Sequence, residues 1–186
     1  MRILTLLLCA VLTVHAQPQG AQPPLERARE AAADLLIALK GTLILHLERG
    51  GPEAALAVCA DTAQVLTESV ARRHGVMMHR VSTRWRNPLD APDAYETAVL
   101  EAFSRLLEKG ELSDTTEHAA VTTADGKRVF RYLRPIRIQR PCLSCHGQEL
   151  APGVQAVLSD YYPDDRATGY SEGDLRGAVS VRFEPD

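Results

Sequence analysis

The sequence lacks several features that would assign it to a common class of protein. It has no second Cys-x-x-Cys pair, which a zinc ribbon requires. It has no apolar run of about 20 residues, the length of a membrane-spanning helix, so we expect no membrane span in the mature chain. Its 21 basic and 24 acidic residues give a net charge of −3, and this balance argues against nucleic acid as a partner.

The most specific segment present is Cys142-Leu143-Ser144-Cys145-His146. The pattern Cys-x-x-Cys-His is the attachment signature of c-type haem, in which each thiol bonds one vinyl group and the histidine binds the iron. The sequence therefore predicts one covalent haem c, bound by Cys142 and Cys145, with His146 as an axial ligand.

Two other chemistries use the same cysteine spacing. A thioredoxin-like redox pair and half of a zinc site are the alternatives. The motif follows Pro141 and runs into Gly147, which indicates a loop rather than the strand-to-helix turn of a thioredoxin. We therefore favour haem attachment.

The N-terminus is typical of a secretory signal peptide. Arg2 gives a positive start, an apolar run covers residues 3–14, and small residues precede a cleavage point after Ala16. We expect a signal peptide over 1–16, a flexible leader over 17–24 and a single haem c-binding domain over 25–186. A periplasmic location agrees with the motif, because bacteria attach haem c outside the cytoplasm.

The apolar periodicity predicts a helical hairpin at the start of the domain. Leu36, Leu39, Leu43 and Leu47 form one stripe on a helix over 25–49, and Gly50-Gly51 ends it. A second helix over 52–74 has a stripe that contains Leu56, Cys59, Ala63, Leu66 and Val70. Cys59 should therefore face the interior.

The rest of the chain predicts a small antiparallel sheet with further helices. Asp125-Gly126 lies between two extended runs and is a strong hairpin signal. The predicted strands cover 76–84, 117–124, 127–138 and 177–183, and the predicted helices cover 92–109 and 153–161. This order predicts an α+β fold, an antiparallel sheet packed with helices, with space for a haem between the layers.

The second axial ligand of the iron is left open by spacing alone. Cys59 is the thiol that remains once the signal peptide is removed and the motif has bound haem. A buried cysteine can also be a small core hydrophobe. Methionine is the usual partner in electron-carrying cytochromes c. The competing candidates are Met77, Met78, His79, His46 and His74.

Several stretches together resemble one known family. They are Ala57-Val58-Cys59-Ala60, then Arg84-Trp85-Arg86-Asn87-Pro88 with Ala91-Pro92-Asp93, then Pro135-Ile136 before the motif, and the closing Arg176-Gly177-Ala178-Val179-Ser180-Val181. The chain resembles a bacterial family of exported haem c proteins with a PAS-like fold and Cys/His ligation of the iron. The domain also occurs as a sensor region of histidine kinases. The resemblance implies a PAS-like sheet, with His146 and Cys59 as the axial ligands.

The haem propionates need cationic or hydrogen-bonding partners. Arg84, Arg86 and Asn87 are the candidates, held by the stiff turn at Pro88, although exposed arginines are often merely solvated.

Two functions fit these residues. One is a redox or gas sensor that exchanges the Cys59 ligand, binds a diatomic gas and signals through a protein partner, because the sequence shows no output domain. The other is a periplasmic electron-transfer cytochrome c. We do not expect an enzyme, since no His–Arg pair for peroxide cleavage can be assigned.

Overall fold

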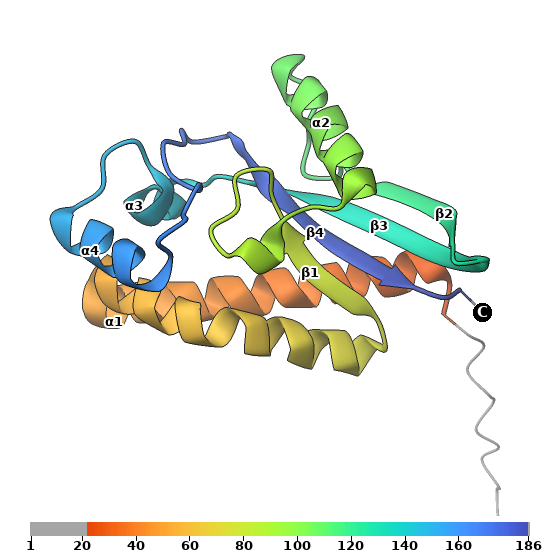
Figure 1. The fold of residues 1–186 in the computed structure, drawn as a ribbon, viewed down its shortest axis with the longest axis horizontal. Helices are drawn as coiled ribbons and strands as arrows, with labels where there is room; N and C mark the ends of the chain where they lie inside the picture. The colour runs from red at the N-terminus through yellow and green to blue at the C-terminus, as the bar shows by residue number, and fades with distance from the viewer. Residues whose placement is uncertain (1–21, 186) are drawn as a thin grey trace, which may run out of the picture.

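The centre of the molecule is a four-stranded antiparallel sheet (Figure 1). The computed structural model describes residues 22–185, so the predicted signal peptide 1–16 and the leader up to residue 21 lie outside the described residues. The strands are β1 (Met77–Val81), β2 (His118–Ala124), β3 (Lys127–Arg137) and β4 (Leu175–Phe183). Their order is β1-β4-β3-β2, which places β4 in the interior of the sheet.

A long helical element, α1 (Pro24–His74), forms the predicted helical hairpin. Gly51 interrupts it with φ 73° and ψ −173°, a conformation that glycine adopts readily, and Pro52 starts the second arm. The first arm covers residues 24–50 and the second arm covers residues 52–74. The Arg27 Nε donates to the carbonyl of His74 at 2.8 Å, so the arms run antiparallel (Figure 1). The predicted hairpin is confirmed.

The turn between β2 and β3 also follows the prediction. Asp125 and Gly126 both have positive φ, 51° and 77°, as a type I′ turn requires. Ala124 pairs with Lys127 directly across the turn, and the register continues to His118 and Leu133.

The two faces of the sheet carry separate cores. The first arm packs on one face through Ala28, Ala31, Ala32 and Leu35, which meet Tyr132, Val179 and Val181. Helix α2 (Ala94–Glu108) covers the other face through Val99, Leu100 and Phe103, which meet Val81, Leu133 and Ala178. The odd and even residues of β4 serve different cores, because side chains alternate along a strand. The α+β fold class predicted from the sequence is confirmed.

The predicted strand over 76–84 is too long. β1 ends at Val81, because the backbone N–H of Ser82 turns away and donates to the carbonyl of Asp90 at 3.0 Å. The chain then forms a short 3₁₀ helix, η1 (Pro88–Asp90), capped by the side chain of Asn87.

The Cys-x-x-Cys-His segment is helical, not the loop that the flanking proline and glycine indicated. It forms a 3₁₀ turn, η2 (Arg140–Cys142), followed by α3 (Leu143–His146). Helix α4 (Pro152–Tyr161) follows, and α3 and α4 lie at the Gly51 end of the α1 hairpin (Figure 1). Leu56, Cys145, Val154 and Leu158 form a small core there. Within residues 22–185, no helix has the length and hydropathy to cross a membrane.

Candidate functional site

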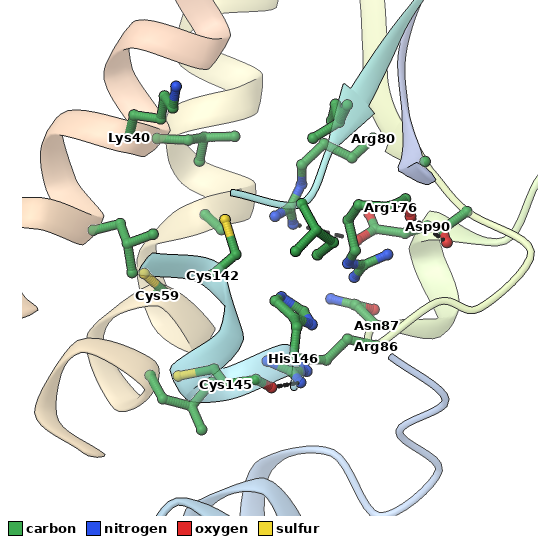
Figure 2. A pocket seen from close by; sticks show the side chains of 18 of the residues that line it. Lys40, Cys59, Arg80, Arg86, Asn87, Asp90, Cys142, Cys145, His146 and Arg176 are labelled. Atoms are coloured by element: carbon green, nitrogen blue, oxygen red, sulfur yellow. Dashed lines mark hydrogen bonds and ion pairs between the residues drawn. The ribbon is translucent and has the colours of Figure 1, made fainter. Parts of the chain in front are cut away.

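A cavity lies where α1, the Cys-x-x-Cys-His turn and one end of the sheet meet (Figure 2). The two arms of α1 give it an apolar wall. The residues of this wall share one face on each arm and are Leu36, Leu39, Leu43, Leu56 and Ala63. Residues of both predicted apolar stripes therefore line the cavity, and Leu36 and Leu39 also pack against the core between α1 and the sheet.

Three cysteines line this cavity from distant parts of the sequence. Cys142 and Cys145 come from η2 and α3, and Cys59 comes from the second arm of α1 (Figure 2). All three are free thiols. Burial raises the pKa of Cys59, and the charges of Arg80 and Arg86 partly oppose this rise. The structure thus brings the predicted sixth ligand to the same cavity as the motif.

The His146 side chain is held as a neutral imidazole. Its Nδ1 lies 2.6 Å from the carbonyl oxygen of Ala167, an acceptor, so Nδ1 carries the proton and Nε2 keeps its lone pair. Burial holds the pKa of His146 well below its usual value, and the nearby Arg86 and Arg176 lower it further. A metal-bound histidine usually donates a hydrogen bond from its other ring nitrogen, and this bond fixes the tautomer.

Arg86 lines the cavity, but its guanidinium is already paired with neighbouring groups of the protein. It donates to the carbonyl of Cys145 at 2.5 Å and pairs with Asp165 at 3.1 Å. A further contact reaches the carbonyl of Ala167 at 3.4 Å. Arg86 is buried, and it ties the haem motif to the segment that holds the His146 ring. Its donors are therefore largely used by the protein itself.

The other two predicted propionate partners differ from each other. Arg84 does not line the cavity: it donates to the carbonyls of Arg166 and Thr168 and stacks on the ring of Tyr170 at 4.0 Å. Asn87 does line the cavity, and its side-chain oxygen accepts from the backbone of Leu89 at 3.0 Å. The structure therefore brings Asn87 and Arg86 to the motif, but not Arg84.

The cavity has charged residues that sequence analysis missed. They are Lys40, Arg80, Asp90, Arg137 and Arg176. Arg80 pairs with the buried carboxylate of Asp90 at 3.3 Å. These residues come from five different elements, and no spacing pattern in the sequence connects them.

The competing ligands do not line the cavity. Met77 is 58% exposed, and Met78 packs against the core between α1 and the sheet. His79 binds Glu96 at 2.9 Å, and His74 binds Asp34 at 2.9 Å. His46 lies on the first arm and is not one of the lining residues. Among the described candidates for the second axial position, Cys59 alone lines the cavity.

The donor set fits a haem better than a bare metal ion. Within residues 22–185 no group of three or more His, Cys, Asp or Glu is placed to hold a metal. A porphyrin supplies four nitrogens itself, so the protein needs to add only axial ligands. The cavity offers those ligands, two thiols for attachment, an apolar wall and cationic side chains. These residues fit a covalently bound haem.

Comparisons with known proteins found one matching family and one similar solved structure. A family model described as Tll0287-like matches residues 11–184. The fold is similar to a solved crystal structure of the cyanobacterial heme-protein Tll0287, with a TM-score of 0.58 and 26% sequence identity. The similarity covers 87% of this chain and 92% of that one. No curated protein matches this chain in sequence.

Proposed function

The chain belongs to the Tll0287-like family, and from this membership and the geometry of the cavity we propose that it is a periplasmic c-type haem protein that senses redox state or a diatomic gas. One haem would be attached through Cys142 and Cys145, with His146 and Cys59 as the axial ligands. The similarity to a heme-protein supports haem binding. The signal-like N-terminus supports export.

The observation that carries the proposal is the position of Cys59. This thiol lies 83 residues before Cys142 in the sequence, yet both line one cavity. A bound haem would supply one-electron redox chemistry and an iron that prefers two axial donors. Cys59 and His146 are suitable donors that the protein presents there, one a thiol and the other a neutral imidazole.

Sensing follows from how weakly the protein favours the Cys59 thiolate. A thiol must lose its proton to bind a metal, and burial already raises the pKa of Cys59. Reduction of a bound haem would add a negative charge to the same space, where a thiolate would be costly. Cys59 Sγ would then hold a proton taken from solvent and leave the axial position. Because Cys59 is part of α1, this change would reach a long element that covers the sheet.

The first test asks whether haem is bound covalently. Mass spectrometry of the exported, purified protein should show a mass gain of one iron porphyrin that survives acid extraction. Both motif thiols should resist alkylation. A colourless protein in which Cys142 and Cys145 react with iodoacetamide would overturn the proposal.

The second test concerns the Cys59 ligand. We predict that Cys59→Ala changes the ferric absorbance spectrum, because the iron loses its thiolate donor. Met77→Ala is the matched control, since Met77 is an exposed side chain outside the cavity, and its spectrum should equal that of the wild type. An unchanged Cys59→Ala spectrum would remove the thiolate from the proposal.

Carbon monoxide separates sensing from electron transfer. After reduction the wild-type protein should bind CO rapidly, because loss of the Cys59 ligand would leave an axial position of the iron open. An electron-transfer cytochrome would keep its six-coordinate spectrum and ignore CO. That outcome would favour the carrier function and reject ligand exchange.

A further inference from the structure

Three cations of the cavity lining have no carboxylate partner within the described residues; Lys40 and Arg137 are exposed, whereas Arg176 is half-buried. Arg176 lies at the start of β4 and lines the cavity. Within the described residues no carboxylate lies within ion-pair distance of its guanidinium, whereas Arg80 pairs with Asp90 and Arg86 with Asp165. The Arg176 side chain makes a single described hydrogen bond, from Nη1 to the carbonyl of Arg84 at 3.2 Å.

This arrangement favours the binding of an anion. Arg176 is half-buried, and burial lowers the pKa of its guanidinium; the charges of Arg86 and Arg80 lower it further, while Tyr170 and Asp90 oppose this effect. A partly desolvated charge without an ion-pair partner is unfavourable. A ligand with a carboxylate at this position would satisfy both the charge and the free donors of Arg176.

The position of Arg176 relative to the motif identifies the part of the ligand it would meet. Figure 2 shows the Arg176 guanidinium on the far side of the His146 ring from the Cys145 sulfur. In a haem the two propionates leave the ring on the edge away from the two vinyl groups. Thioether bonds at Cys142 and Cys145 would hold the vinyl edge, so the propionate edge would lie toward Arg176.

We propose that Arg176, with Arg80 beside it, forms the carboxylate-binding end of the cavity and holds the haem propionates. This assignment rests on the proposed function, and it replaces the sequence-based choice of Arg84 and Arg86. Arg84 is bound to carbonyls outside the cavity, and Arg86 binds the protein through its backbone contacts and Asp165. Asp90 pairs with Arg80 and holds its guanidinium at the cavity.

The test compares single variants of the haem-loaded protein by resonance Raman spectroscopy. Arg176→Gln and Arg80→Gln should shift the propionate bending bands, because the carboxylates lose charged donors. Arg176→Lys keeps the charge and should restore much of the wild-type band position. Arg182→Gln is the matched control: it removes the same charge from an exposed position of the same strand, six residues along and outside the cavity lining, and should leave the bands in place.

The outcomes separate this inference from the proposed function. Unshifted bands in folded, haem-loaded Arg176→Gln and Arg80→Gln would overturn the assignment and leave haem binding intact. An equal shift in Arg182→Gln would also overturn it. A wild-type protein that carries no haem would overturn both proposals. Circular dichroism melts verify that each variant is folded, and Arg80→Gln provides the decision if Arg176→Gln does not fold.

Discussion

At the residue scale, Arg86 holds the haem motif in its orientation. Its guanidinium joins Cys145, Asp165 and Ala167, and the carbonyl of Ala167 also fixes the His146 ring. A buried arginine with this many acceptors stabilises the fold mainly by satisfying them, since the acceptors would otherwise be unpaired. The residue therefore supports the positions of Cys145 and His146.

We predict that Arg86→Gln lowers the free energy of unfolding by about 3 kcal/mol, because it leaves the buried Asp165 carboxylate without its charged partner. Urea unfolding followed by circular dichroism measures the change. Arg84→Gln is the control: Arg84 is exposed, and we expect a loss of about 1 kcal/mol or less. Equal losses in the two variants would contradict the role given to Arg86.

The sequence pointed to Cys59, Cys142, Cys145 and His146, which the structure brings to one cavity, but not to the charged lining. Spacing left the choice between Cys59 and the Met77–His79 cluster open, and the family resemblance favoured Cys59. Arg176 and Arg80 look like ordinary surface arginines in the sequence. Their role arises where the strand ends bring them to one cavity, and this depends on strand register, which a single sequence does not determine.

At the element scale, a buried ionic network joins α2 to the sheet. Glu96 is 2% exposed and accepts hydrogen bonds from His79 on β1 and Ser180 on β4. Burial alone would raise the pKa of Glu96, but the bonds from His79, Ser180 and the backbone of Asp93 lower it to about 2. The hydrogen bond to Glu96 raises the pKa of His79, against an opposing effect of burial.

The stability of the fold should therefore depend on pH in two windows. The contribution of ionised Glu96 is present above its unfolded pKa of 4.5 and is lost as the pH falls toward 2. That shift corresponds to about 3 kcal/mol. The contribution of charged His79 is present below 6.5 and is lost as the pH rises through its raised pKa.

The measurement is a series of urea unfolding curves from pH 2 to 8 on the wild type and on Glu96→Gln. We expect the wild type to be most stable between about pH 5 and 6.5, where both charges are present. In Glu96→Gln both windows should flatten, because the carboxylate and its effect on His79 are lost together. Parallel pH profiles for the two proteins would contradict the network.

The elements show where sequence patterns are sufficient. The hinge of α1 and the β2–β3 turn followed from Gly50-Gly51-Pro52 and Asp125-Gly126, because backbone chemistry at these positions is local. The end of β1 and the helical form of the motif did not follow from the sequence. Both depend on partners elsewhere in the chain. The carbonyl of Asp90 accepts a hydrogen bond from the Ser82 N–H, and the carbonyl of Ala167 accepts one from the His146 ring.

At the scale of the whole molecule, an iron held by Cys59 and His146 would act as a cross-link between residues 87 positions apart. A link of this length restricts the unfolded chain and stabilises the fold by about 2–4 kcal/mol, as a disulfide does. We predict that Cys59→Ala lowers the thermal stability of the haem-loaded protein. The same substitution in a chain that also carries Cys142→Ala and Cys145→Ala should change stability little.

Thermal unfolding of the four proteins forms a cycle that measures this coupling. The wild type, the Cys59→Ala variant, the motif variant and the combined variant are compared under one buffer condition. If Cys59→Ala costs the same with and without the motif cysteines, the thiol contributes only packing, and the cross-link is absent.

The residues of the site are synthesised in sequence order, with Cys59 on the hairpin first and the motif later. If the chain is exported from its N-terminus as proposed, Cys59 would enter the envelope before the motif that would give it a partner. During that interval it would be an unpaired thiol in an oxidising compartment. The first and second arms can fold together early through local contacts, with Cys59 on the face of the hairpin that lines the cavity. The hairpin would thus have one candidate ligand in position before the residues of the motif are made.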